Sequence, residues 1–191
     1  MINRSKRLPW RLALLLAALC ATAHAQDLSA AMPGDLIFRE GTEVISDAVR
    51  AVDDGEFSHV GMLIGSPGQW RVLHATPSEV SGRGDGVTID SLAFFVDAVR
   101  ARRYAVYHVH ATAEQHARAQ LQALGKLGRK FRIADPAGTY CTALVWDSWR
   151  AAGVDLQVTF TTLRIPFLRG RYLLPSALQR SPLLTPLHVS K

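Results

Sequence analysis

Two apolar segments on either side of a short turn constrain the fold of this chain more than any other feature. His59–Gly65 and Trp70–Ala75 each have the length and the apolar, partly β-branched content of a buried strand. The segment between them, Ser66-Pro67-Gly68-Gln69, has the composition of a turn. The sequence therefore predicts an antiparallel β-hairpin.

The length of that turn fixes which residues of the two strands pair. With Gly65 opposite Trp70, Gly61 pairs with His74, and His59 lies diagonally opposite His74 on the same face. A shift of one residue would separate the two histidines onto opposite faces. Two neighbouring histidines can act as a base and the group that orients it. A strand histidine is more often a satisfied core residue, so the pair alone leaves both roles open.

The remaining periodicity indicates an α+β domain. Further short strands are expected at 36–38, 87–89 and 104–109, and helices at about 42–52, 113–128 and 141–153. The end of the chain, rich in Leu and Pro, gives no assignable pattern. This order of elements favours an antiparallel sheet with helices beside it.

The first 25 residues have the layout of a secretory signal peptide. Basic residues between Arg4 and Arg11 precede an apolar run, Leu12–Leu19, and Ala23-His24-Ala25 offers small residues for cleavage. The run is too short to span a bilayer, which takes about 20 residues. We therefore predict a signal peptide at 1–25 and one domain at 26–191, exported to the periplasm or the cell exterior, without a transmembrane segment.

Removal of this segment changes the charge and the cysteine count. Four of the 22 basic residues and none of the 16 acidic residues precede Ala25, so the domain carries a net charge of +2. No Lys/Arg-rich face is interleaved with aromatic residues, and nucleic-acid binding is not indicated. Cys20 leaves with the signal, so Cys141 stands alone and cannot form an internal disulfide. A membrane anchor and a lipoprotein attached through Cys20 are the alternatives.

Cys141 begins one of the predicted helices. Leu144, Val145, Trp149 and Ala152 follow it at helical spacing, which places Cys141 on the inward face of the first turn. The free N–H groups and the dipole at a helix start favour a thiolate and can bind an oxyanion. We therefore expect a lowered thiol pKa, although the position alone slightly favours a small apolar residue packed at a helix end.

Three motifs resemble the NlpC family of papain-like cell-wall peptidases. They are Pro33-Gly34-Asp35-Leu36-Ile37-Phe38, Ser58-His59-Val60-Gly61-Met62-Leu63-Ile64-Gly65 and Leu73-His74-Ala75. The cysteine motif Tyr140-Cys141-Thr142-Ala143-Leu144-Val145 follows these segments instead of preceding them. That order resembles the permuted branch, the YiiX/YaeF-type amidases. The resemblance implies a circularly permuted papain-like (NlpC-like) domain with an antiparallel sheet and flanking helices.

The resemblance also implies roles for three residues. Cys141 matches the nucleophile, His59 the catalytic base and His74 the third catalytic member. In several permuted members an acid stands where this chain has His74, which leaves the third role the least certain of the three. No cofactor is implied.

These observations predict a secreted cysteine hydrolase that cleaves an amide or peptide bond of the cell envelope, such as a cell-wall peptide. A lipid-directed amidase or acyltransferase that uses the same thiol is the first alternative, with Leu163–Leu187 lining an acyl pocket. The second alternative is a non-catalytic binding module of the same fold. The expected partner is thus an amide, peptide or lipid substrate.

The other polar candidates indicate less. His108 and His110 alternate on a predicted strand and could form a metal pair, but no third ligand stands at a suitable spacing, so no metal is predicted. Asp35 follows a turn, where capping of backbone N–H groups is its expected role. Tyr140 is expected to be a packed aromatic residue.

Overall fold

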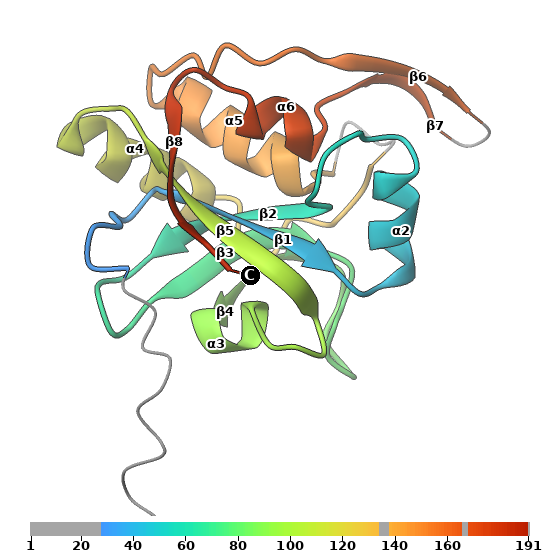
Figure 1. Ribbon diagram of the computed structural model, residues 1–191, viewed down its shortest axis with the longest axis horizontal. Coiled ribbons are helices and arrows are strands. Elements are labelled where there is room, and N and C mark those ends of the chain that lie inside the picture. The colour runs from blue at the N-terminus through green and yellow to red at the C-terminus, as the bar shows by residue number, and fades with distance from the viewer. Residues whose placement is uncertain (1–27, 134–137, 166–167, 191) are drawn as a thin grey trace, which may run out of the picture.

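Figure 1 shows the computed structural model, which describes residues 28–133, 138–165 and 168–190. Six strands form one antiparallel sheet in the order β4-β3-β2-β1-β5-β8, and two more form a separate hairpin. The strands are β1 (Leu36–Gly41), β2 (His59–Ile64), β3 (Arg71–Thr76), β4 (Gly86–Ser91), β5 (Ala101–Val109), β6 (Thr161–Ile165), β7 (Leu168–Tyr172) and β8 (Leu184–Val189). The helices are α2 (Val44–Arg50), α3 (Leu92–Phe95), α4 (Ala113–Leu124), α5 (Cys141–Ala151) and α6 (Pro175–Gln179).

The predicted signal peptide at 1–25 lies outside the described residues. Within the described ranges, every helix is too short or too polar to cross a bilayer.

The β2–β3 hairpin forms in the predicted register. Met62 pairs with Leu73, which continues the series that places Gly61 opposite His74. Gly61 has no room for a side chain, because a Cβ there would lie 2.3 Å from Val72 Cγ1. Gly65, at a φ of +100°, begins the turn in a conformation that favours glycine. The prediction of a hairpin with both histidines on one face is confirmed.

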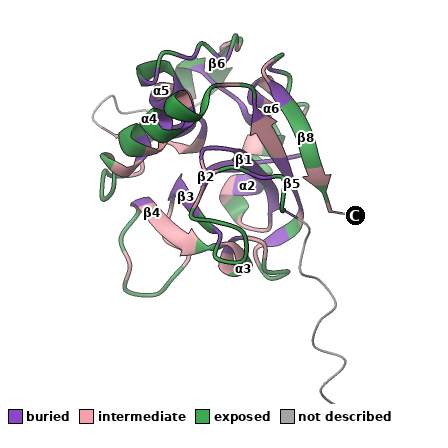
Figure 2. Cartoon of the chain, turned by 90° about the vertical axis from the view of Figure 1, so that its left-hand side faces the viewer, coloured by how far each residue is buried: buried purple, intermediate pink, exposed green. Residues whose placement is uncertain are grey.

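Helices cover the two faces of the sheet unequally. α4 and α5 pack on one face, and α3 lies on the other, below the sheet in Figure 1. Trp149 of α5 is fully buried among strand residues, as its place on the apolar stripe predicts. The second face is covered by fewer residues, mainly Leu28, Trp70 and Phe95. Figure 2 shows the resulting burial of β1, β2 and β3 between these layers.

Two predicted helix boundaries differ from the structure. α2 has Glu43 at its N-cap position, because the Thr42 hydroxyl donates to Val99 O (2.6 Å) in a neighbouring loop instead. α4 ends at Leu124, with Gly125 at the C-cap, where the predicted helix continued. Glycine destabilises a helix interior by about 1 kcal/mol, which explains the earlier end.

The end of the chain forms a helix and a strand that its Leu- and Pro-rich sequence did not predict. β8 pairs with β5 as an edge strand and includes Pro186, opposite Tyr107. Proline is tolerated on an edge strand, because an edge strand has one side without a neighbouring strand, where an N–H is not needed. α6 begins with Pro175 at its first turn, another position that accepts proline.

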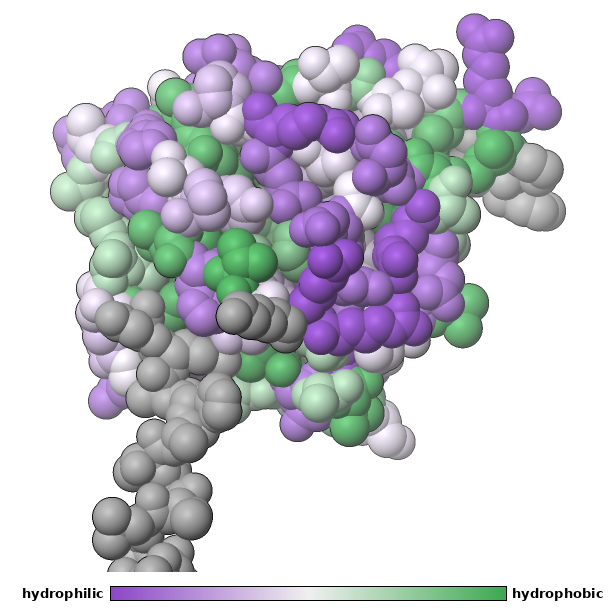
Figure 3. Space-filling model, in the orientation of Figure 1, coloured by the Kyte–Doolittle hydropathy of each residue, from purple (hydrophilic) through white to green (hydrophobic). Residues whose placement is uncertain are grey.

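Figure 3 shows a hydrophilic patch to the right of centre, beside α2 and the start of β5. Arg50 of α2 and Arg102 and Arg103 at the start of β5 form ion pairs with the buried Glu40, at 2.6, 3.3 and 2.8 Å. Burial alone would raise the pKa of Glu40, but the hydrogen bonds from the arginines lower it. The patch is therefore balanced by internal ion pairs.

Candidate active site

Hydrogen bonds of the two neighbouring residues, Tyr140 and Thr142, hold Cys141 in place at the start of α5. Tyr140 occupies the N-cap position with an extended backbone, and Cys141 is the first residue of α5. The Thr142 hydroxyl donates to Leu173 O (2.7 Å), and Leu173 N–H donates to the Tyr140 hydroxyl (3.2 Å). The start of α5 is thus held to the segment that leads into α6.

The two predicted histidines meet and continue into an acid. His59 Nε2 lies 2.8 Å from His74 Nδ1, and His74 Nε2 lies 3.0 Å from Asp90 Oδ2. Arg83 donates to both oxygens of the carboxylate, from Nη1 to Asp90 Oδ1 (2.7 Å) and from Nη2 to Asp90 Oδ2 (3.2 Å). His74 is fully buried between its two partners. The arrangement is a hydrogen-bonded chain of two imidazoles that ends on a carboxylate.

Sequence reasoning missed Asp90. The predicted strand ended at Ile89, whereas β4 continues to Ser91 and pairs His74 with Thr88. Asp90 is therefore the diagonal neighbour of His74 on the same face. The alternation of Thr88 and Asp90 is a signal in the sequence, but the loop between β3 and β4 is too long for its length to fix the register.

Hydrogen-bond donors can be assigned along this chain. Because the Asp90 carboxylate only accepts, His74 donates to it from Nε2 and accepts at Nδ1. His59 must then donate from Nε2 to His74, which leaves the lone pair of His59 on Nδ1. The Asp90 carboxylate thus determines, through His74, that the free nitrogen of His59 is basic.

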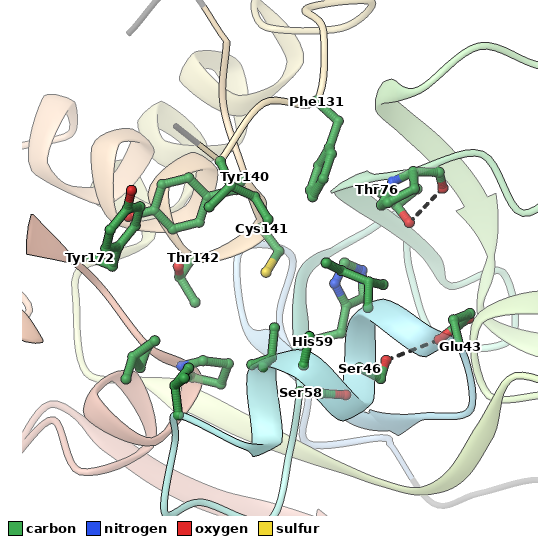
Figure 4. Close-up of a pocket in the computed structure, with 18 of the residues that line it drawn as sticks. Glu43, Ser46, Ser58, His59, Thr76, Phe131, Tyr140, Cys141, Thr142 and Tyr172 are labelled. Atoms are coloured by element: carbon green, nitrogen blue, oxygen red, sulfur yellow. Dashed lines mark hydrogen bonds between the residues drawn. The ribbon is translucent and has the colours of Figure 1, made fainter. Parts of the chain in front are cut away.

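Cys141 and His59 line the same cavity. Figure 4 shows the sulfur of Cys141 and the ring of His59 directed toward one another. Since His59 Nε2 is bonded to His74, the remaining Nδ1 is the nitrogen available to the thiol. The sequence-predicted residues Cys141, His59 and His74 are therefore gathered in one place.

Burial sets the protonation state of the pair. It raises the pKa of the Cys141 thiol to about 11, and hydrogen bonds from the backbone N–H groups of Val60 and Thr142 offset this only in part. Burial, with the charge of Arg39 added, holds the pKa of His59 well below 6.5. The predicted lowering of the thiol pKa is wrong, because loss of water outweighs the effect of the helix start. The resting pair is a neutral thiol beside a neutral imidazole.

A buried arginine stands next to this pair. Arg39 is 2% exposed and is the direct cross-strand partner of His59. Its Nη2 contacts Glu43 (3.1 Å) and Glu79 (2.6 Å), and its guanidinium lies 4.6 Å from the ring centre of Phe95. Two carboxylates therefore hold a positive charge that disfavours a second charge on His59.

The cavity that Cys141 and His59 line has a volume of about 330 Å³. One wall is the apolar face of α2, and the opposite wall comes from the segment between Leu163 and Pro175. The aliphatic side chains that line it are Val44, Ile45, Ala48, Val49, Val52, Ile133, Leu163, Leu173 and Leu174. Beside the thiol there is thus room for an aliphatic group of a ligand.

Comparison with known proteins places this geometry in a family. Residues 30–187 match the family of permuted papain-like amidases, YaeF/YiiX, the C92 family. This chain belongs to that family. The crystal structure of the metalloprotein yiiX from Escherichia coli O157:H7 has the same fold, with a TM-score of 0.70 at 20% identity over 83% of this chain and 97% of that one. No curated protein sequence matches the chain.

Membership of the permuted papain-like amidases confirms the predicted fold and supports a cysteine-type amidase or hydrolase in general terms. In this family the order of the chain is changed, and here the histidine strands β2 and β3 precede the helix that carries Cys141. The sheet brings them together because α5 packs on β2 and β3. Chain order is immaterial to a site defined by geometry.

A second histidine cluster in this amidase lies apart from the thiol. Ligand atoms of Asp35, His108 and His116 lie within 4.8 Å of one another, whereas His110 contacts Thr185 instead. Asp35 accepts from Met32 N (2.8 Å), the capping role predicted for it. Both nitrogens of His116 lie 2.9 Å from backbone carbonyl oxygens, and His108 Nδ1 lies 2.9 Å from Asp35 Oδ1. Backbone groups and Asp35 therefore hold the two rings in place.

Proposed function

We propose that this chain is a thiol-dependent amidase in which Cys141 is the nucleophile and His59 the general base. His74 orients His59, and Asp90 anchors His74. The observation that supports the proposal most strongly is the chain of hydrogen bonds from His59 to Asp90, which leaves a basic nitrogen on the side of the thiol. A non-catalytic binding module would have no need for a carboxylate that sets the tautomer of a buried imidazole pair.

The first step starts from uncharged groups. His59 Nδ1 accepts the thiol proton while the Cys141 sulfur attacks the amide carbonyl carbon and forms the C–S bond. The carbonyl oxygen becomes an oxyanion, which the free N–H groups at the start of α5 are placed to bind. The imidazolium that forms on His59 is stabilised through His74 by the negative charge of Asp90.

The second step releases the amine. His59 returns its proton to the amide nitrogen as the C–N bond breaks, and the acyl group remains on Cys141 as a thioester. Water then attacks the thioester with His59 as base, and the free acid leaves. No cofactor takes part in either step.

For the substrate, we propose an amide or peptide of the bacterial envelope, in keeping with the predicted export. One observation favours a second candidate, the lipid-directed amidase or acyltransferase. The cavity beside the thiol is walled by aliphatic side chains, among them Leu163, Leu173 and Leu174 from the segment expected to line an acyl pocket. An acyltransferase would differ only in that an acceptor other than water attacks the thioester.

A substrate panel tests the proposal. Purified enzyme and its Cys141→Ala and His59→Ala variants are incubated with muropeptides and with N-acylated lipids, and products are identified by mass spectrometry. We expect amide cleavage that both substitutions abolish, and an acyl adduct on Cys141 in the wild type. Cleavage that persists in Cys141→Ala refutes the thiol mechanism. Release of fatty acid with muropeptides untouched selects the lipid-directed candidate.

A further inference from the structure

A buried aromatic ring packs on the imidazole pair from α3, the short helix on the second face of the sheet (Figure 1). By strand alternation, His59 and His74 project from the face that also carries Leu63 and Val72. Those two apolar residues form one buried cluster with Phe95 of α3, which is 0% exposed. Phe95 therefore lies on the same side of the sheet as both histidines.

The ring of Phe95 contacts each imidazole. Its centre lies 5.2 Å from the ring centre of His74, with the two planes at 88°, and 5.6 Å from that of His59, with the planes at 30°. The two imidazole centres lie 5.1 Å apart at 74°. All three separations fall within the range of about 4.5–7 Å over which aromatic rings attract one another. The phenyl ring and the two imidazoles thus form one packed group.

The same residue also holds the buried arginine beside the pair. The guanidinium of Arg39 lies 4.6 Å from the ring centre of Phe95, and its Nη1 donates to Phe95 O (3.2 Å). A cation over an aromatic ring is attracted to the negative face of the ring. The position of the Arg39 charge relative to His59 therefore depends on both the ring and the backbone of Phe95.

Hydrogen bonds fix the ring of His74 more completely than that of His59. Both nitrogens of His74 are bonded, one to His59 and one to Asp90. The bond at Nε2 alone would let the ring of His59 turn about that nitrogen and carry Nδ1 away from the thiol. A closely packed neighbour blocks such a turn, because the turned ring would overlap it. Phe95 is that neighbour on the second face of the sheet.

We propose that Phe95 is a positioning residue of this amidase, whose ring holds His59 with Nδ1 toward the thiol and keeps water away from the imidazole pair. The inference rests on the proposed function for the role of His59 as base. Phe95 does not line the thiol cavity, so it acts on the base and not on the substrate. Burial lowers the pKa of both histidines, and the phenyl ring supplies part of that burial.

Two substitutions separate the two effects of the ring. Phe95→Ala admits water and removes the packing surface, so the pKa of both histidines should rise toward 6.5 and the ring of His59 should become more mobile. Phe95→Leu keeps the site apolar without a flat ring, so the pKa should stay low while the mobility increases. NMR titration and relaxation of labelled histidines measure both quantities without a substrate. The other charged or titratable groups that face the pair are kept in both variants, namely Arg39, Glu79, Asp90 and the Cys141 thiol.

Kinetics with the substrate identified by the panel test the consequence for catalysis. We expect kcat to fall by about 10- to 100-fold in both variants with KM within about twofold of wild type, because a displaced base slows the chemistry and leaves binding intact. Leu63→Ala is the matched control. Leu63 is a fully buried member of the same cluster, four residues along β2 from His59, so its truncation also destabilises the fold. It should leave the histidine pKa and kcat within about twofold of wild type.

Several outcomes would overturn the proposal. They are wild-type histidine pKa and mobility in both Phe95 variants, an unchanged kcat, a loss that appears in KM alone, and an equal change in Leu63→Ala, which would assign the effect to lost stability. Phe95→Leu keeps most of the buried volume and carries the test on mobility and kcat if Phe95→Ala does not fold. The expected NMR changes in a protein without thiol-dependent cleavage would leave the positioning of His59 standing and refute the proposed function alone.

Discussion

Asp90 offers the sharpest test of how the site is organised, since Asp90→Asn removes the negative charge and keeps the size and shape of the side chain. Burial alone would raise the pKa of Asp90, but hydrogen bonds from His74 and Arg83 lower it to about 2. Arg83 donates to Oδ1 at 2.7 Å and to Oδ2 at 3.2 Å, so the new amide keeps its oxygen at the shorter contact and directs its NH₂ toward His74. His74 must then accept at Nε2 and donate from Nδ1, and His59 is left with a proton on the nitrogen that faces the thiol.

The expected loss has two parts. The shift of the Asp90 pKa from 3.8 to about 2 corresponds to about 2.5 kcal/mol, at about 1.4 kcal/mol for each tenfold change in proton affinity. Because burial opposes this shift, the combined effect of His74 and Arg83 is larger, and an equal share for His74 is at least about 1 kcal/mol, a factor of at least about five in rate. The reversed tautomer removes the base itself, which contributes about 10²- to 10⁴-fold. We expect kcat/KM to fall by at least about 100-fold in total.

The assay combines kinetics with a spectroscopic signature. Turnover of the substrate found in the panel gives kcat/KM, and ¹⁵N NMR of the histidine rings reports which nitrogen carries the proton in His59 and His74. Arg83→Gln is the control, because it keeps the carboxylate and the tautomers and should cost less than about tenfold. An Asp90→Asn enzyme within threefold of wild type, or one with unchanged tautomers, would refute the reasoning.

Three further predictions follow from burial and charge. Because burial raises the pKa of the Cys141 thiol to about 11, its alkylation by iodoacetamide should be slow at neutral pH, and the rate should still increase above about pH 9. Intact-mass measurement gives this rate, and a rate that levels off below about pH 8 would contradict the prediction. Since burial lowers the pKa of His59 and His74, the unfolded chain binds more protons than the folded chain below about pH 6.5. The midpoint temperature of thermal unfolding should therefore decrease when the pH is lowered from about 7 to about 5, and this decrease should be smaller in His59→Ala. Arg39→Met leaves Glu43 and Glu79 without their buried partner and should destabilise the fold by about 3–5 kcal/mol in urea unfolding, whereas Arg102→Met at the surface should cost under about 1 kcal/mol.

The neutral resting pair has a consequence for reactivity. In the proposed mechanism, a thiol with a pKa of about 11 stays a weak nucleophile until a substrate fills the cavity and His59 takes the proton. A thiol in its neutral form also reacts slowly with oxidants, which would protect it in the oxidising compartment to which the predicted signal directs the chain.

Local patterns in the sequence determined the framework of this site. The two apolar runs of β2 and β3 and the length of their turn predicted a register, and the register placed His59 and His74 on one face. The apolar stripe after Cys141 placed that cysteine at the start of a helix, on its inward side. These inferences succeed because they depend on neighbours within a few residues, whose geometry the backbone dictates.

Tertiary structure decided the chemistry. Asp90 joins the chain only because β4 pairs with β3 across a loop of undetermined register, and Arg39 sits beside His59 because β1 pairs with β2. The thiol pKa follows from burial by the surrounding segments, and one of the two aliphatic walls of the cavity comes from a segment without readable periodicity. Desolvation and cavity shape depend on groups distant in the chain, so they arise only when the whole domain is packed.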